Sequence, residues 1–173
     1  ALAVIALSLS TSEASLMVIP LVLALGASAP IIGRLLDKFG TKIVMFAGTF
    51  ILVIGLFSLS FFASNFYLFI ISGVVTGLGL GTVLGSPLRY IMLTESPPEK
   101  RASGQALINF NSSTGQLVGG ALVGAVIGSQ LDKLVGYQSA YILIAIIAII
   151  MMLLTLGLKN RADQLETMKN NSN

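Results

Sequence analysis

The stretch Gly33-Arg34-Leu35-Leu36-Asp37-Lys38-Phe39-Gly40-Thr41-Lys42 decides the fold of this chain. It holds four charged residues and two glycines within ten positions, and long apolar runs flank it on both sides. This combination is typical of a tight turn between two membrane spans, because glycines let two helix ends approach closely. Basic residues hold such a turn on the cytoplasmic face of the membrane. The stretch therefore predicts a helical hairpin in a membrane protein.

The composition also indicates a membrane protein. The mean hydropathy is +0.93, and only 10% of the residues are charged, against about a quarter in soluble domains. A membrane span needs about twenty apolar residues, so the chain has room for about five or six. Cysteine and histidine are both absent, which excludes thiol catalysis and Cys/His zinc sites. We expect no metal, no other cofactor and no enzymatic activity, since no metalloprotease or Ser/His motif is present either.

The charged and polar residues divide the chain into an all-α bundle and a tail. We expect a helix stub at residues 1–9 and a short polar turn, Ser10-Thr11-Ser12-Glu13. Five complete transmembrane helices are predicted at about residues 14–32, 43–63, 66–93, 102–127 and 139–158. Helices are predicted because every backbone polar group in lipid must be satisfied within its own segment. The bundle thus covers residues 1–158, and residues 159–173 form a loose polar tail with at most one helical turn. Since the chain opens on Ala1 within an apolar run, we expect it to be a fragment of a longer protein.

The distribution of cations predicts the orientation of the spans. Eight of the ten Lys and Arg residues fall on alternate loops that share one side: Arg34, Lys38, Lys42, Lys100, Arg101, Lys159, Arg161 and Lys169. Lys133 lies on the other side, and Arg89 lies near the end of a span. Such asymmetry marks the cytoplasmic face, so we expect a cytoplasmic C-terminus. Nucleic acid is not an expected partner, because these cations sit at span ends and are not interleaved with aromatic residues.

Two separate stretches resemble the major facilitator superfamily of transporters. The signature loop of that family reads G-x-L-a-D-r-x-G-r-k, and it is matched by Gly33, Leu35, Asp37, Lys38, Gly40 and Lys42. Leu36 replaces the usual small residue, and Thr41 replaces a basic one. The stretch from Ser96 to Gly104 resembles the loop before the penultimate helix in drug-exporting branches of the family. The resemblance covers about residues 10–160 and implies the C-terminal six-helix half of a transporter.

The resemblance implies a function, a location and partners. It implies secondary active transport of small molecules by alternating access, as drug or metabolite efflux coupled to protons in the plasma (inner) membrane. The implied partners are the lipid bilayer, the N-terminal half of the same transporter, a small-molecule substrate and protons. No Asp or Glu lies deep within a predicted span, so this segment offers no evident proton carrier. One alternative is a self-standing membrane scaffold or assembly protein without transport activity, and another is an oligomeric channel.

The signature loop supplies the first candidate site, a conformational latch formed by Gly33, Arg34, Asp37, Lys38, Gly40 and Lys42. The resemblance assigns Asp37 to a latch in which the carboxylate pairs with an arginine and with the N-terminal end of a neighbouring helix. An anion is favoured at that end by about 0.3–1 kcal/mol. The alternative is an ordinary solvated carboxylate near Arg34 and Lys38. In the next loop, Ser96 is predicted to cap the following helix, with Glu99 three residues later.

Polar side chains within the spans supply candidates for the lining of a cavity. Gln105, Asn109, Ser112 and Gln116 share one narrow face of a helix. A polar face is costly in lipid, so it either bonds a neighbouring helix or lines a substrate path. Weaker candidates for the cavity lie in the preceding span: Thr76, Thr82, Ser86 and Tyr90.

Glycines that recur every fourth residue predict close helix packing. One stripe comprises Gly73, Gly77, Gly81 and Gly85, and a second comprises Gly120, Gly124 and Gly128. Small residues at this spacing let helix backbones approach, either in a static contact or on a gliding surface. Gly48 lies on no such stripe, so we expect a larger side chain to be tolerated better there than at Gly77 or Gly81.

Overall fold

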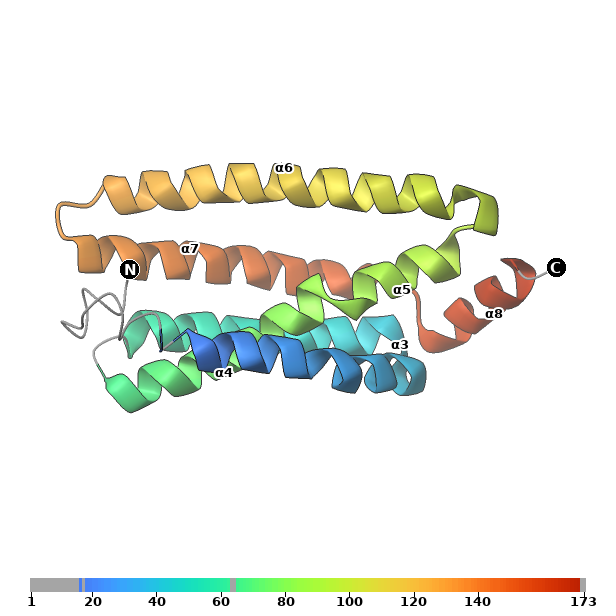
Figure 1. Cartoon of the computed structure of the whole chain (residues 1–173), viewed down its shortest axis with the longest axis horizontal. Coiled ribbons are helices and arrows are strands. Elements are labelled where there is room, and N and C mark those ends of the chain that lie inside the picture. Colours follow the sequence, from blue (N-terminus) through green and yellow to red (C-terminus); the bar gives the residue numbers. More distant parts are fainter. Residues whose placement is uncertain (1–15, 17, 63–64, 172–173) are drawn as a thin grey trace.

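The predicted hairpin is one bent helix, α3 (Ile19–Phe61), which doubles back at Gly40 (Figure 1). The structure is a computed structural model that describes residues 16, 18–62 and 65–171. The predicted stub and polar turn at the N-terminus fall outside these residues. The 43 residues of α3 would extend for about 65 Å if straight, twice the thickness of a bilayer core of about 30 Å. The bend divides them into a first arm, residues 19–39, and a second arm, residues 41–61.

The remaining described elements are helical too, in agreement with the predicted all-α fold. They are α4 (Phe66–Leu84), α5 (Ser86–Glu95), η1 (Pro98–Lys100), α6 (Arg101–Gly128), α7 (Lys133–Leu154), η2 (Thr155–Gly157) and α8 (Arg161–Asn171). Among the described helices, three stretches are long and apolar enough to span a membrane: Ile19–Phe61, Phe66–Leu93 and Lys133–Gly157. The polar residues of α6 explain why this helix, although 28 residues long, does not join them.

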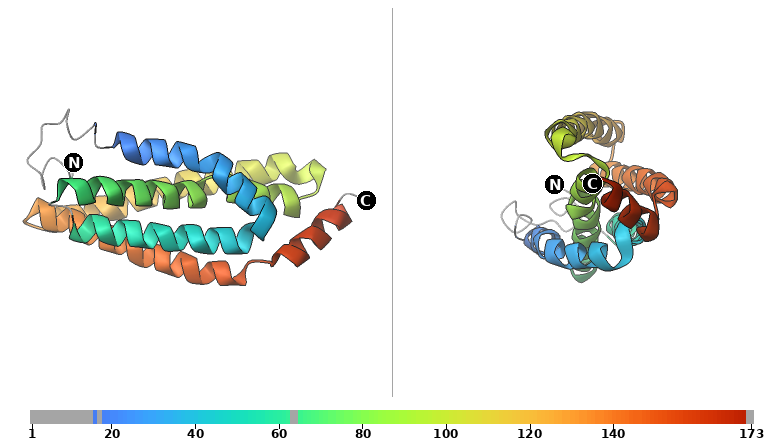
Figure 2. Two further views of the ribbon diagram at one scale, coloured as in Figure 1. Left: turned by 90° about the horizontal axis from the view of Figure 1, so that it is seen from below. Right: turned by 90° about the vertical axis from the view of Figure 1, so that its right-hand side faces the viewer.

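Helix α4 packs between the two arms of α3 and contacts both through glycines (Figure 2). Towards the first arm, a Cβ atom at Gly77 would meet the Leu21 carbonyl group, and one at Gly81 would meet the Ser28 hydroxyl. Towards the second arm, a Cβ at Gly79 would lie 2.6 Å from the Leu52 Cα atom. Such close approach leaves no room for a side chain. The glycines of α4 therefore fix how deeply it sits between the arms.

Glycines of the second arm of α3 make the same kind of contact, which corrects one prediction. A Cβ at Gly48 would overlap the Thr82 side chain, and one at Gly55 would lie 2.7 Å from the Thr76 backbone nitrogen. Gly48 is therefore a close-packing glycine, although it lies on no four-residue stripe. At Gly73, by contrast, the nearest atom would be 3.9 Å away, which is an ordinary contact.

A break separates α4 from α5, where the sequence predicts one continuous span. Gly85 has non-helical angles, with φ −90° and ψ −132°, and Pro87 stands in the first turn of α5. Proline has no N–H to donate, and its ring crowds the carbonyl group four residues earlier. The chain therefore changes direction at Gly85.

The hydrophobic core lies between the second arm of α3 and α7. Leu52 and Leu56 of α3 pack there against Ala145 and Ala148 of α7, and the Ser60 hydroxyl donates a hydrogen bond to the Gln138 carbonyl oxygen. Helix α6 runs along the outside of α7, apart from α4 (Figure 1). None of its residues is buried, so α6 is attached to this part of the chain by one side only.

The bend of α3, η1 and α8 all lie at one end of the bundle, which we call the basic end (Figure 1). The eight cations that the sequence assigns to one side lie on or beside these segments. At the opposite end, Asn65 caps α4 by accepting from the Tyr67 and Leu68 amides. Asp132 caps α7 by accepting from the Leu134 amide, so α7 begins at Lys133 and not at the predicted residue 139.

Two local predictions at the basic end are wrong. Ser96 is the residue after α5, and the N-cap of α6 is Lys100, which makes no side-chain capping bond. The two prolines that follow Ser96 shift the helix start, because the chain first forms the short η1 turn. The tail, predicted to hold at most one turn of helix, contains the 11-residue helix α8. Contacts with α3 and α5 hold this helix against the bundle.

Candidate functional site: the signature turn and its surroundings

Gly40 makes the signature turn possible. Its backbone angles, φ 78° and ψ 172°, fall in a region that is essentially restricted to glycine. A Cβ at this position would also lie 3.0 Å from the Cβ atom of Arg161 in α8. The other signature glycine, Gly33, would meet no described atom within 4 Å. The close approach predicted for the two glycines therefore occurs at Gly40 and not at Gly33.

Arg161 joins three elements at the signature turn. Its Nη2 atom donates to the carbonyl oxygen of Asp37 at 2.8 Å, and its Nη1 atom donates to the Tyr90 hydroxyl at 2.8 Å. The Tyr90 side chain packs on the buried cluster of Ile32, Leu36 and Val44, which comes from both arms of α3. The guanidinium group thus connects α8 with the bend of α3 and with α5.

Gln164 contacts the start of the second arm. Its Oε1 atom accepts from the Thr41 backbone N–H at 3.3 Å, while its Nε2 atom donates to the Lys159 carbonyl oxygen at 3.2 Å. Gln164 is 3% exposed and Thr41 is fully buried. The Thr41 hydroxyl has no partner among the described residues. Side chains of α8 therefore bond backbone groups of the turn at two positions.

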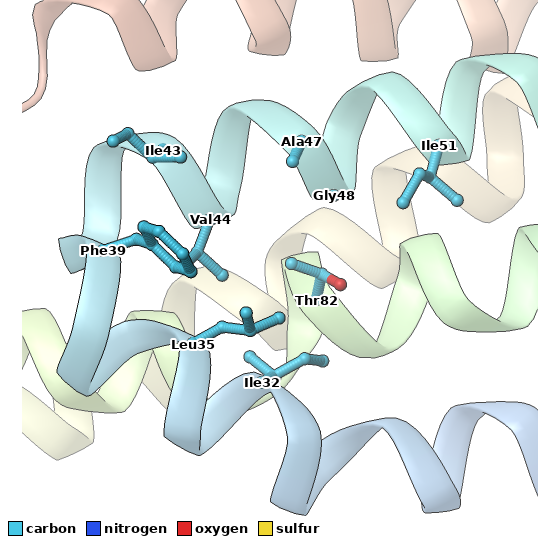
Figure 3. A pocket seen from close by; sticks show the side chains of 9 residues that line it. All are labelled: Ile32, Leu35, Phe39, Ile43, Val44, Ala47, Gly48, Ile51 and Thr82. Carbon is cyan, nitrogen blue, oxygen red and sulfur yellow. The ribbon is translucent and has the colours of Figure 1, made fainter.

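An apolar groove lies beside the turn, between the two arms of α3 (Figure 3). It has a volume of about 270 Å³, and its walls come from both arms with Thr82 of α4. The lining residues are Ile32, Leu35, Phe39, Ile43, Val44, Ala47, Gly48, Ile51 and Thr82. The Lys38 ammonium group lies 5.3 Å from the centroid of the Phe39 ring. The groove is therefore apolar inside, with a cation close to one wall.

The charged members of the signature stretch face outwards. The side chains of Arg34, Asp37 and Lys38 are exposed, and Lys42 is partly exposed. No described residue pairs with the Asp37 carboxylate, whereas the backbone carbonyl of Asp37 is held by Arg161. The latch role of the carboxylate remains a prediction, for which the described residues supply no partner.

The polar face of α6 is open in the described chain. Gln105 is half-buried and donates from its Nε2 atom to the Asn109 Oδ1 atom at 3.2 Å. Asn109, Ser112 and Gln116 are exposed. A Cβ at Gly120, Gly124 or Gly128 would meet no described atom within 4 Å. The polar face and the second glycine stripe therefore lack a packing partner in this part of the protein, and their roles stay predictions.

Two of the remaining candidates for a cavity lining, Thr76 and Tyr90, make contacts with neighbouring helices instead. Thr76 is 3% exposed, donates to the Ser72 carbonyl oxygen of its own helix and faces Gly55. Tyr90 is engaged by Arg161. The groove between the arms of α3 touches neither residue, whereas Thr82, another of the candidates, lines it. Sequence reasoning missed Arg161 and Gln164, although their spacing places both on one face of a helix.

Comparison with known proteins finds a matching family model and several relatives. A family model described as Major Facilitator Superfamily matches residues 1–170. An MFS-type transporter of Aspergillus fumigatus is 30% identical over 91 residues, which are 53% of this chain and 20% of that protein. The multidrug resistance protein Stp of Mycobacterium tuberculosis is 25% identical over 122 residues, 70% of this chain and 22% of Stp.

A third relative is a named antiporter. The proton-coupled antiporter flippase LtaA of Staphylococcus aureus is 31% identical over 115 residues, 66% of this chain and 28% of LtaA. The matched stretches thus cover 20–28% of the lengths of these three relatives.

Proposed function

Because this chain belongs to the Major Facilitator Superfamily, we propose that it is the C-terminal half of a secondary active transporter of small molecules. The observation that carries the proposal is the signature turn, whose sequence matches the family loop and whose Gly40 has a backbone conformation restricted to glycine. Transport would proceed by alternating access, in which the two halves rock about a site near the middle of the membrane.

The chain would cross the membrane five times in its described part. The two arms of α3, the pair α4–α5, α6 and α7 would be the five spans, and the basic end would face the cytoplasm. The excess of cations at that end supports this orientation. A plasma-membrane location follows from the same family and remains part of the proposal.

The N-terminal half of the transporter would cover α6. Exposed amides on a spanning helix are costly in lipid, and Asn109 and Gln116 are exposed in the described chain. A second half that packs on the free side of α6, or a water-filled path between the halves, would satisfy them. The same half would supply the partner of the Asp37 carboxylate.

Efflux in exchange for protons is the coupling we propose. Its support comes from the names of two relatives, a multidrug resistance protein and a proton-coupled antiporter. The seven Asp and Glu residues of this chain lie in predicted loops and tail, so the carboxylate that carries the proton is expected in the other half. We expect no enzymatic activity.

Vesicles that contain the full-length protein test the proposal. With an imposed proton gradient, a cationic dye such as ethidium should accumulate, and an ionophore that collapses the gradient should abolish accumulation. An Asp37→Asn variant at equal protein amount serves as the control for a transport-specific signal. A folded, correctly inserted protein that moves no member of a drug panel would contradict the proposal and favour the scaffold alternative.

A further inference from the structure

We propose that α8 is a clasp that positions the signature turn, with Arg161 and Gln164 as its two positioning residues. The role of this clasp in transport rests on the proposed function, but the clasp itself does not. The inference starts from the backbone at the bend, where a helix changes direction without an intervening loop.

The clasp binds the two backbone groups that the bend separates. In a regular α-helix, the N–H of one residue bonds the carbonyl group four residues earlier, so Thr41 and Asp37 would pair with each other. The non-helical angles of Gly40 disturb the helix between them. Arg161 donates to the Asp37 carbonyl, and Gln164 accepts from the Thr41 N–H. Helix α8 therefore offers a donor and an acceptor to the two ends of one disturbed helix bond.

The side chains of the clasp are well suited to this task. The guanidinium group presents several donors in a rigid plane, so Arg161 can bond the Asp37 carbonyl and the Tyr90 hydroxyl together. Gln164 is oriented by its second bond, to the Lys159 carbonyl, and is almost fully buried. A buried amide of this kind would be costly without partners, and both ends of the Gln164 amide are paired in the docked position of α8.

The clasp also couples the turn to α5. Tyr90 receives one Arg161 bond while its ring packs on residues of both arms of α3. A movement of α5 relative to the bend would separate Arg161 from one of its two acceptors. Release of α8 would therefore free both the turn and the part of α5 around Tyr90. This is the property expected of a site that controls a conformational change.

Hydrogen–deuterium exchange of the full-length protein in lipid nanodiscs tests the clasp without any substrate. We expect Arg161→Gln and Gln164→Leu to raise exchange of the Thr41 amide, followed in peptides that cover residues 35–45, by about tenfold. A tenfold change corresponds to about 1.4 kcal/mol. The matched control is Arg89→Gln, since Arg89 is an exposed arginine next to Tyr90. Exchange within twofold of the wild type in both clasp variants would overturn the proposal.

Transport measurements then separate a positioning role from a merely structural one. Arg161→Gln should change the transport rate at saturating substrate by at least about twofold at equal protein amount. Arg161→Lys keeps the charge but not the planar set of donors, so its transport rate should lie between those of Arg161→Gln and the wild type. An unchanged rate despite faster exchange would overturn the role in transport. If the wild-type protein transports nothing, the proposed function fails, and the exchange result still decides whether the clasp exists.

Discussion

Replacement of Gly55 by alanine tests whether glycines set the distance between α3 and α4. The added Cβ would lie 2.7 Å from the Thr76 backbone nitrogen and 2.9 Å from the Thr76 Cα atom. Because these are backbone atoms, no change of side-chain rotamer can relieve the overlap. The two helices must separate by several tenths of an ångström along a contact that is otherwise closely packed.

The cost follows from the loss of that packing. Overpacking of a well-packed interior costs about 1–3 kcal/mol, which outweighs the gain of up to about 1 kcal/mol from replacing glycine by alanine within a helix. We therefore expect Gly55→Ala to lower the unfolding free energy of the full-length protein. In a detergent melt, each kcal/mol lost should lower Tm by about 1–2 °C, because the shift becomes smaller as the chain becomes longer.

Gly73→Ala is the matched control. Gly73 is also buried on α4, but its Cβ would lie 3.9 Å from the nearest atom, the Leu21 Cβ. This variant should melt at or slightly above the wild-type temperature, since only the helix-propensity gain remains. A Gly55→Ala protein that melts no lower than Gly73→Ala would refute the claim that backbone proximity at Gly55 limits the packing of α3 on α4.

Three further predictions concern the proposed transporter. Asp37→Asn should reduce transport with little loss of expression, because the latch needs the charge; normal rates in vesicles would make Asp37 an ordinary loop residue. Single cysteines at the exposed Lys38 and Ser129 should label from opposite sides of the membrane, and labelling from the same side would contradict the topology. Asn109→Cys should react with a hydrophilic maleimide, and substrate should slow the reaction; an unreactive cysteine together with an unstable Asn109→Leu protein would indicate a helix contact instead.

The main features of the fold were predictable from local patterns. The position of the bend at Gly40 follows from a glycine among charges between two apolar runs, and the helix after Asn65 begins where the sequence predicts. The start of α7 was predicted six residues too late, at residue 139, because the Asp132 cap that begins the helix at Lys133 was not recognised. Ser96 misled the prediction, because two prolines follow it and the short η1 turn delays the start of α6 to Arg101. A cap signal is thus reliable only where the next residues can enter a helix at once.

Contacts between distant residues were less predictable. The four-residue spacing identified Gly77 and Gly81, but Gly48 and Gly55 lie seven residues apart on the second arm and were not recognised. The contact between Arg161 and Asp37 joins residues 124 positions apart, and no periodicity in the tail encodes it. Tertiary packing, which a single sequence does not display, determines both.

The break at Gly85 gives the span α4–α5 two halves with unequal freedom. Glycine contacts hold α4 on both sides, whereas the 10 residues of α5 would act as a lever about 15 Å long if the chain flexed at Gly85 after Arg161 had released Tyr90. A tilt of about 10° would carry its far end through about 3 Å. The start of α6 would follow, because a Cβ at Gly104 would lie only 3.1 Å from the Met92 side chain of α5. A small rotation at one glycine would therefore be magnified into a displacement of η1 and of the start of α6.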